Sequence, residues 1–368
     1  MDLGGHTRSL TRFWNQSKSR ERFARLANAA GPFPSVLLIW AQMKSKTSPS
    51  ARSSASGRNL SMELVRVTEQ AALAAARLLG RRDKEAADQV AVDAMRLMMK
   101  DVDMDGIVVI GEGEKDEAPM LFNGEQVGNG SPPQVDVAVD PVDGTTLTAK
   151  GQPNALAVLA VADRGAMFNP GPSLYMEKIV VGPEAADVVD IEAPVATNLR
   201  RVAKAKGGRI EDITVMILER DRHIDLIRQV GEAGARIKLI ADGDVASSIA
   251  AASEENTGVD MILGIGGSPE GIISACAIKC LQGCMQAKLY PRNAQERQAA
   301  QDAGYDLNQV LTLDDLVKGD AFFAATGISD GDLLKGVRFK GKTATTQSIV
   351  MRSHSGTVRI VTAHHLLG

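Results

Sequence analysis

The segment VDVAVDPVDGTT, residues 135–146, begins as an apolar strand and ends in an acidic turn. Its valine-rich first half favours a buried β-strand, and Asp143-Gly144 is a dipeptide typical of turns. Asp140 and Asp143 therefore follow directly on the expected strand. The same arrangement, an apolar strand followed by an acidic turn that contains glycine, recurs along the chain and organises it.

Strand and helix patterns alternate on the carboxyl-terminal side of this segment. Strands are expected at 155–162, 214–218, 236–240 and 261–265, and helices near 222–233, near 244–253 and from Glu270. This alternation predicts a sheet with helices packed on it. Closing strands, expected at 322–326, 348–352 and 357–361, are predicted to return to the second sheet, the one formed in this half of the chain.

On the amino-terminal side, two helices precede the first expected strand at 107–110. Apolar positions recur at helical spacing from Met62 onward, which predicts the first helix. Asp83 is expected to open the second helix. This places Lys84 and Asp88 one turn apart on the same face of that helix.

The composition is that of a soluble globular protein. The chain has 368 residues and a mass of 39.0 kDa, which is long enough for two domains. Hydrophobic residues make up 44% and charged residues 24% of it, close to the usual averages. No apolar run approaches the roughly 20 residues of a transmembrane helix. We therefore expect no membrane-spanning segment.

Charge is distributed unevenly along the chain. Residues 1–61 contain ten Lys or Arg against two acids, a net charge of +8, so the remainder carries −11 within the total of −3. Binding to a phosphate backbone needs a basic face, so the acidic body argues against nucleic acid as a partner. It is compatible with a carboxylate-rich metal site.

Residues 1–61 are rich in Ser and Arg and lack sustained periodicity. We expect a disordered extension, which is either an organelle transit peptide or the result of a start site assigned too far upstream, since Met62 begins a well-patterned helix. Cys276, Cys280 and Cys284 are spaced four apart, as on one flank of a helix, and no other Cys could pair with them. This indicates a reducing compartment: the cytoplasm, or a plastid if the extension is a transit peptide.

Acidic residues follow several of the expected strands within glycine-rich turns. They are Glu112 and Glu114, Asp140 and Asp143, Asp242 and Asp244, and Glu270. Functional groups in such sheets gather beyond the carboxyl ends of strands, so these carboxylates are expected to converge. Like charges that close together predict raised pKa values or a bound cation such as Mg²⁺ or Mn²⁺. Each Asp-Gly pair taken alone is also an ordinary turn former.

Several common catalytic signatures are missing from the sequence. There is no Walker A run, no His-Glu-x-x-His and no Gly-x-Ser-x-Gly. The run GIGGSPEG at 264–271 lacks the third glycine of a dinucleotide-binding loop, because Pro269 stands in its place. These absences leave the acidic turns as the main candidates for chemistry.

The run DPVDGTT at 140–146, downstream of Glu112, resembles the metal-binding turn of the metal-dependent sugar and inositol phosphatase superfamily. Further runs narrow the resemblance to class II fructose-1,6-bisphosphatase from Met62 to the end of the chain: ADQVAVDAMR, VIGEGEKDEAPML, GQPNALAVLAVA, DGDVASSIA, GIGGSPEGIISA and FAATGISDGDLLKG. The implied fold is α+β or α/β, a layered αβαβα sandwich of two mixed sheets with helices between and outside them. We expect an N-terminal metal-binding α+β domain at 62–215 and a C-terminal α/β substrate domain at 216–368.

The resemblance also implies roles for individual residues. The metal ligands would be Asp88, Glu112, Asp140, Asp143 and Glu270. The substrate contacts would be Asp143, Gly144, Thr145, Tyr175, Arg220, Asp221, Arg222, Asp242, Gly243, Asp244 and Gly267. The catalytic residues would be Asp116, Thr145 and Lys84. The family often has Glu at the position of Asp143 and usually Pro at that of Asp221, departures that bear on substrate choice more than on chemistry.

The implied function is that of a hydrolase of carbohydrate metabolism, in gluconeogenesis or the Calvin cycle. It would hydrolyse the 1-phosphate of fructose 1,6-bisphosphate with Mg²⁺ or Mn²⁺, and sedoheptulose 1,7-bisphosphate would be a second substrate. Two alternatives stay open: an inositol or nucleotide phosphatase of the same superfamily, and a non-catalytic phosphosugar-binding sensor. The complete set of acids and Thr145 argue against the sensor. The resemblance further implies a homo-oligomer, a dimer or a tetramer.

Overall fold

The computed structural model describes residues 60–111, 121–253 and 257–367. Its α-helices are α3 (Leu60–Ala76), α4 (Lys84–Met99), α5 (Thr145–Lys150), α6 (Val195–Ala205), α7 (Ile224–Glu232), α8 (Asp244–Ala252), α9 (Ser268–Cys280), α10 (Ala294–Asp302) and α11 (Leu313–Leu316). Within the described ranges, no helix is both long enough and apolar enough to cross a membrane.

The first sheet has eight strands in the order β12-β13-β11-β4-β3-β1-β2, and β14 pairs with β13. They are β1 (Asp105–Ile110), β2 (Gln126–Val127), β3 (Gln134–Asp143), β4 (Leu156–Asp163), β11 (Ala321–Gly327), β12 (Arg338–Lys340), β13 (Thr343–Arg352) and β14 (Thr357–Leu366). The pair β1 and β3 is parallel, whereas β3 with β4 and β4 with β11 are antiparallel. The sheet is therefore mixed, as predicted.

The closing strands differ from the prediction, because they complete the first sheet rather than the second. β11 pairs with β4 along its whole length and with β13 on its other side. Every residue of β11 is buried, since α3 packs against one face of the sheet and α9 against the other. Apolar composition indicates that such a strand is buried, but it does not determine which sheet the strand joins.

The second sheet has six strands in the order β10-β9-β5-β8-β6-β7. They are β5 (Tyr175–Val181), β6 (Thr214–Leu218), β7 (Arg236–Ile240), β8 (Met261–Gly267), β9 (Cys284–Leu289) and β10 (Leu311–Thr312). β6 runs parallel to both β7 and β8, whereas β5 is antiparallel to β8 and β9. The carboxyl ends of β6, β7 and β8 therefore meet at one edge, together with the beginning of β5.

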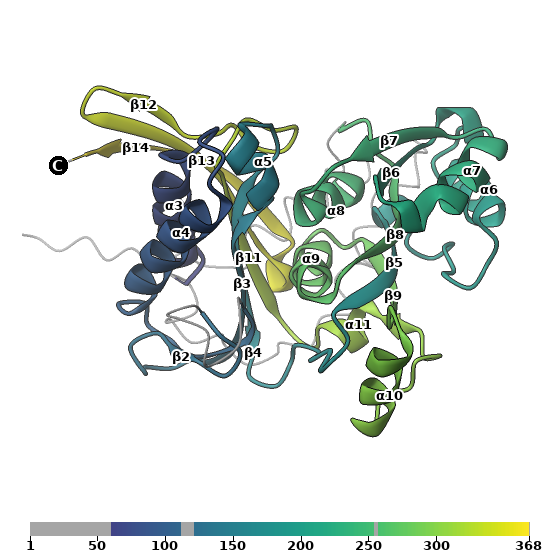
Figure 1. Cartoon of the computed structure of the whole chain (residues 1–368), viewed down its shortest axis with the longest axis horizontal. Coiled ribbons are helices and arrows are strands. Elements are labelled where there is room, and N and C mark those ends of the chain that lie inside the picture. The colour runs from purple at the N-terminus through teal and green to yellow at the C-terminus, as the bar shows by residue number, and fades with distance from the viewer. Residues whose placement is uncertain (1–59, 112–120, 254–256, 368) are drawn as a thin grey trace, which may run out of the picture. The chain divides into compact units, whose positions relative to one another are not determined.

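The elements form five layers, which confirms the predicted αβαβα sandwich (Figure 1). Helices α3 and α4 cover the outer face of the first sheet, α8 and α9 lie between the sheets, and α6 and α7 cover the outer face of the second. Each interface has its own apolar cluster: one beneath α3 and α4, one around α8 and α9, and one beneath α6 and α7. Which strands share a sheet does not test the domain boundary between residues 215 and 216, so that boundary stays a prediction.

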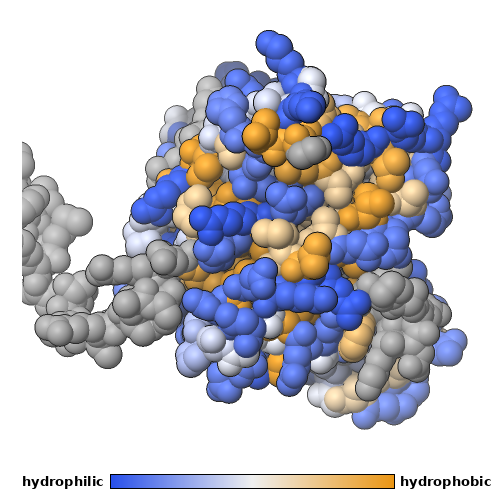
Figure 2. Space-filling model, turned by 90° about the vertical axis from the view of Figure 1, so that its left-hand side faces the viewer, coloured by the Kyte–Doolittle hydropathy of each residue, from blue (hydrophilic) through white to orange (hydrophobic). Residues whose placement is uncertain are grey.

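The face on the side of α3 and α4 is largely polar, with smaller apolar patches between the charged side chains (Figure 2). Large apolar side chains exposed on these helices are Met62, at 40%, and Leu97, at 63%. Scattered apolar residues of this kind are normal for a protein surface. In this outer layer α4 buries one apolar stripe and leaves its other side to solvent, whereas α3 is buried around most of its surface.

Two local features modify the sequence reading. β3 continues through Asp143 instead of ending at 139, with an irregular register between Asp140 and Asp143 where Pro141 has no N–H for the ladder. Cys284 lies on β9 rather than on the helix that holds Cys276 and Cys280. The helix ends at Cys280, and the left-handed backbone of Gln282 (φ 59°) turns the chain out of the helix before Cys284.

Candidate active site

A cavity of about 370 Å³ lies at the carboxyl ends of β6, β7 and β8. Predicted site residues from four separate segments line it: Tyr175, Arg220, Arg222, Asp242, Asp244, Gly267 and Glu270. They converge because each follows or begins a strand at the same edge of the second sheet.

The two Asp-Gly turns have the same backbone geometry and lie next to each other. Gly144 (φ 93°) and Gly243 (φ 84°) are both in the left-handed region and directly precede α5 and α8. A side chain there would strain the turn, which explains the choice of glycine. The carboxylate of Asp143 accepts a hydrogen bond from the N–H of Ala246 at 3.3 Å. This bond joins a carboxylate of the first sheet to the first turn of α8 beside the second sheet.

Carboxylates from both sheets share this region and influence one another. Burial raises the pKa of Asp143 well above its ordinary value, and the charges of Asp244, Asp242 and Glu270 raise it further. The pKa of Glu270 is raised by burial and by the charge of Asp244. These four acids therefore form a cluster in which negative charge is costly unless a cation compensates it.

Lys178 supplies one such cation from within the protein. It is 2% exposed in the middle of β5, and its ammonium group forms an ion pair with the carboxylate of Asp244. The sequence prediction missed this residue. The available signal was the strand YMEKIVV, in which Lys178 directly precedes three apolar residues. A lysine buried in such a strand requires an acidic partner.

The glycines of GIGGSPEG provide space for the acids. A Cβ at Gly266 would lie 2.2 Å from Oδ2 of Asp244, and a Cβ at Gly267 would lie 1.9 Å from Oε2 of Glu270. Gly267 is also the residue that precedes α9. The run is glycine-rich because the carboxylates of Asp244 and Glu270 occupy the space that side chains at 266 and 267 would need. This role explains the glycines without a dinucleotide-binding loop.

The arginines of the site are held by main-chain carbonyl groups. Arg220 donates hydrogen bonds to the carbonyl oxygens of Glu219 (2.9 Å) and Ala241 (2.7 Å). Arg222 donates through Nε and Nη2 to the carbonyl oxygen of Ile265, at 3.1 and 2.8 Å. Because carbonyl groups are uncharged, both guanidinium groups keep their full positive charge toward the cavity.

His223 supports this arrangement from inside the protein. Its Nε2 accepts a hydrogen bond from the N–H of Ile265 at 2.8 Å, and its Nδ1 lies 2.7 Å from the carbonyl oxygen of Leu218. The neutral imidazole protonated on Nδ1 satisfies both partners. Burial lowers the pKa of His223, in agreement with a neutral ring. The residue thus fixes the ends of β6 and β8 relative to each other.

The remaining predicted residues lie on other elements. Asp88 is half-buried on α4, which packs against α5 and β3, and burial raises its pKa. Oδ1 of Asp140 accepts a hydrogen bond from the N–H of Val142 at 3.0 Å. Lys84 and Thr145 are the first residues of α4 and α5, and Asp221 is exposed. Glu112, Glu114 and Asp116 lie outside the described residues.

The acidic cluster is suited to a hard divalent cation, although the described residues do not form a closed set of ligands. Among them, no three His, Cys, Asp or Glu side chains lie close enough together to hold a metal ion. Carboxylate oxygens are nevertheless the ligands that hard divalent ions prefer, and burial together with neighbouring carboxylates raises the pKa of both Asp143 and Glu270. The donor set therefore fits a divalent cation.

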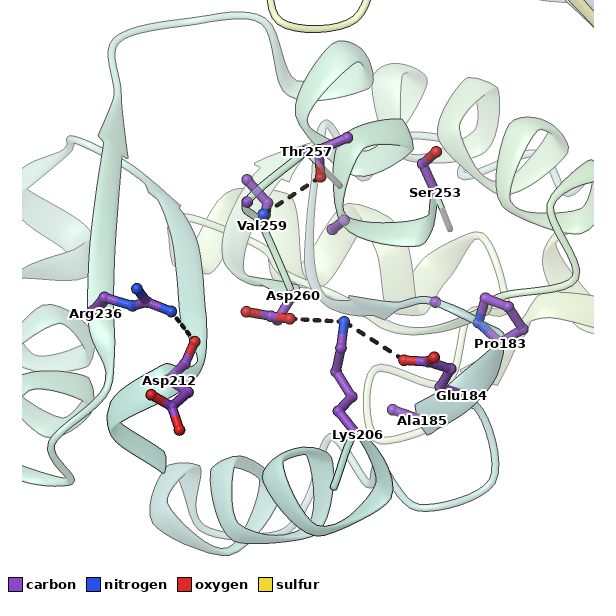
Figure 3. Close-up of a pocket in the computed structure, with 13 residues that line it drawn as sticks. Pro183, Glu184, Ala185, Lys206, Asp212, Arg236, Ser253, Thr257, Val259 and Asp260 are labelled. Carbon is purple, nitrogen blue, oxygen red and sulfur yellow. Dashed lines mark hydrogen bonds and ion pairs between the residues drawn. The ribbon is translucent and has the colours of Figure 1, made fainter. Parts of the chain in front are cut away.

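A second cavity, of about 380 Å³, lies at the opposite ends of these strands (Figure 3). Its charged groups pair with each other: Nζ of Lys206 lies 2.7 Å from Asp260 and 3.8 Å from Glu184. The guanidinium of Arg236 donates to the carbonyl oxygen of Asp212. Because three acids, Glu184, Asp212 and Asp260, line this cavity with only two cations, Lys206 and Arg236, it is a poorer candidate for an anionic substrate than the one lined by Arg220 and Arg222.

The sandwich, with acids and arginines around one cavity at the strand ends, is the arrangement expected of the sugar phosphatase class. Residues 58–365 match the family described as bacterial fructose-1,6-bisphosphatase, glpX-encoded. The chain belongs to this family, whose members are phosphoric monoester hydrolases that require a divalent metal cation.

Named relatives agree with the family assignment. Fructose-1,6-bisphosphatase 1 class 2 of Escherichia coli (strain K12) is 46% identical over 324 residues, which cover 84% of this chain and 96% of that protein. The fructose-1,6-bisphosphatase class 2 of Shigella flexneri has the same identity and coverage. A solved structure, an extragenic suppressor from Pyrococcus furiosus, is 14% identical over 53% of this chain and 69% of that chain, with a TM-score of 0.26. So low a TM-score adds nothing to the fold described above.

Proposed function

We propose that this protein hydrolyses the 1-phosphate of fructose 1,6-bisphosphate to fructose 6-phosphate and phosphate, and that sedoheptulose 1,7-bisphosphate is a second substrate. The observation that carries the proposal is that carboxylates and guanidinium groups line one cavity. Asp242, Asp244 and Glu270 line it together with Arg220 and Arg222. A bisphosphate needs both kinds of group, one for metal-assisted hydrolysis and one for the phosphate that remains.

Mg²⁺ or Mn²⁺ is the proposed metal, and Asp88, Glu112, Asp140, Asp143 and Glu270 are its proposed ligands. Support comes from the cluster of carboxylates with raised pKa values and from the oxygen chemistry of all five side chains. When bound, the metal would polarise the phosphate and acidify a water molecule. Lys178 already offsets part of the negative charge by pairing with Asp244.

The protein's own groups orient the substrate and the water. Thr145 is proposed to hold the attacking water through its hydroxyl group, with Asp116 as the neighbouring base and Lys84 beside the reacting phosphate. Tyr175, Arg220 and Arg222 would bind the other phosphate, and Gly144, Gly243 and Gly267 would allow the main chain to approach the substrate. Asp221, exposed beside Arg222, is the least constrained of the proposed contacts.

The deciding experiment measures phosphate release from three substrates: fructose 1,6-bisphosphate, sedoheptulose 1,7-bisphosphate and inositol monophosphate. Each is tested with Mg²⁺, with Mn²⁺ and with chelator. Hydrolysis of the sugar bisphosphates that stops with chelator is the expected result. Preference for inositol monophosphate would favour the alternative phosphatase, and no release from any substrate would favour a sensor.

We further propose a cytoplasmic homo-oligomer, a dimer or a tetramer. The three cysteines are free, and burial raises the pKa of the Cys276 thiol to about 12, which is consistent with a reducing compartment. The oligomeric state follows from the family resemblance. Light scattering of the purified protein would measure it directly, and a monomeric mass would contradict it.

A further inference from the structure

We propose that Arg292 is a substrate-binding residue, which Glu296 positions beside Tyr175 to bind the phosphate that is not hydrolysed. The inference rests on the proposed function, because it presupposes a sugar bisphosphate in the cavity. It adds a residue from a segment that supplies none of the predicted contacts.

Arg292 reaches the cavity from a different direction than the other arginines. It lies three residues after the end of β9 and lines the cavity of about 370 Å³. Arg220 and Arg222 enter the same cavity from the end of β6. Because β9 and β6 lie on opposite sides of β5 and β8 in the sheet, the arginines approach the cavity from different strands.

Tyr175 connects the two groups. The guanidinium carbon of Arg292 lies 4.8 Å from the centre of the Tyr175 ring, and that of Arg222 lies 5.2 Å from it. Both distances are within the range of cation–π attraction, about 6 Å. One ring therefore holds two cations at the same corner of the cavity.

Glu296 holds Arg292 in place before any ligand binds. Its Oε1 accepts a hydrogen bond from Nε of Arg292 at 2.9 Å and another from Nη2, and its Oε2 accepts one from the main-chain N–H of Arg292 at 2.8 Å. The N–H of Glu296 is in turn capped by the side chain of Asn293 at 2.8 Å. Two of the five guanidinium N–H groups are used by Glu296, which leaves donors on Nη1 and Nη2 for a phosphate.

The charges around the cavity determine where each phosphate of a bisphosphate would bind relative to Arg292. Arg220 and Arg222 are held by neutral carbonyl groups, so the arginines around Tyr175 keep a net positive charge even though Glu296 compensates Arg292. Asp242, Asp244 and Glu270 contribute negative charge to the same cavity. A sugar bisphosphate would therefore place its retained phosphate near Tyr175 and its reacting phosphate near the acids. Arg292 would distinguish a bisphosphate from a monophosphate.

The test compares Arg292→Gln with Arg292→Lys and with a control, Arg297→Gln. The control removes an exposed arginine of the following helix, α10, that does not line the cavity. We would measure kcat and KM for fructose 1,6-bisphosphate and fructose 1-phosphate, and the affinity for fructose 6-phosphate by calorimetry. Arg292→Gln should raise KM for the bisphosphate and weaken fructose 6-phosphate binding by about tenfold or more, the effect of losing a charged hydrogen-bond donor.

In Arg292→Gln, the kcat/KM for fructose 1,6-bisphosphate divided by that for fructose 1-phosphate should also fall by about tenfold or more. Arg292→Lys should recover part of it, because lysine keeps the charge but not the planar fork, and the control should behave as the wild type. Equal losses for both substrates, or unchanged fructose 6-phosphate binding, would overturn the proposal. A wild-type protein that hydrolyses neither substrate would instead overturn the proposed function, and fructose 6-phosphate binding would still test Arg292.

Discussion

The ammonium group of Lys178 and the carboxylate of Asp244 form an ion pair beneath the floor of the cavity, with Lys178 only 2% exposed. The pair joins the middle of β5 to the first residue of α8. It places a fixed positive charge among acids that otherwise repel one another. The substrate cavity is thus built around an internal charge that none of the acidic turns reveals.

Lys178→Met should therefore destabilise the protein strongly, because it leaves the carboxylate of Asp244 buried without its cation. The expected loss is about 3–5 kcal/mol of unfolding free energy, measured by urea denaturation. Lys204→Met, on the exposed face of α6, serves as the control and should change stability by less than about 0.5 kcal/mol. If the double variant with Asp244→Asn were no more stable than Lys178→Met alone, the unpaired charge would not be the cause.

Asp143→Asn should change how the metal-free protein responds to pH. Burial and then the charges of Asp244, Asp242 and Glu270 raise the pKa of Asp143. A carboxyl group with a raised folded-state pKa adds stability below its unfolded pKa, about 3.9, and that stability is lost as the pH rises through the folded-state pKa. With chelator at neutral pH, we therefore expect a higher Tm for the variant than for the wild type.

The control for this experiment is Asp225→Asn, whose carboxylate on α7 is 84% exposed and should leave the pH dependence unchanged. Added Mg²⁺ or Mn²⁺ should raise the Tm of the wild type more than that of Asp143→Asn, because only the wild type has the full negative charge. Parallel curves of Tm against pH for the wild type and Asp143→Asn would contradict the interpretation.

Gly266→Ala should disturb the site through sterics alone. The added Cβ would lie 2.2 Å from Oδ2 of Asp244 and 3.1 Å from Nζ of Lys178, so the ion pair would have to move. We expect at least a tenfold loss of kcat/KM in the phosphate-release assay. Gly231→Ala on α7 meets no atom closer than 3.9 Å and should be stabilising by about 0.5–1 kcal/mol. Full activity of Gly266→Ala would show that the pair tolerates displacement.

Asp140→Asn should abolish turnover and leave the fold intact. The Oδ1 atom of an asparagine can still accept the hydrogen bond that Val142 donates at 3.0 Å, so the turn keeps its support. The lost charge should weaken metal binding, measured by calorimetry, and lower kcat by a factor of about 100 or more. An unchanged kcat at saturating metal would remove Asp140 from the proposed ligands, provided that circular dichroism shows a native fold.

Local sequence signals predicted much of the architecture. The strand at 236–240 has the predicted bounds, and Asp83 caps α4 by accepting from the N–H of Ala86 at 3.0 Å. Both depend on neighbouring residues: alternating apolar positions in one case and a side chain that reaches three residues ahead in the other. The position of Cys284 was mispredicted, because a spacing of four cannot show that the helix ends at Cys280 and that Gln282 adopts a left-handed backbone.

The convergence of the acidic turns could also be anticipated from the sequence, because parallel strands bring their carboxyl ends to one edge. Asp242, Asp244 and Glu270 do line one cavity. Lys178 and Arg292 could not be found in this way. Their partners, Asp244 and Tyr175, are distant in sequence, and only the packed sheets bring them within reach.

The sequence alone therefore determined many of the strands and helices and the acidic turns, since these depend on residues within a few positions of one another. Tertiary structure decided which sheet the closing strands join and which charges meet. β11 pairs with β4 although more than 150 residues separate them, and its apolar side chains would have suited either sheet. Burial and charge pairing depend on the environment that the whole chain creates, which no local pattern contains.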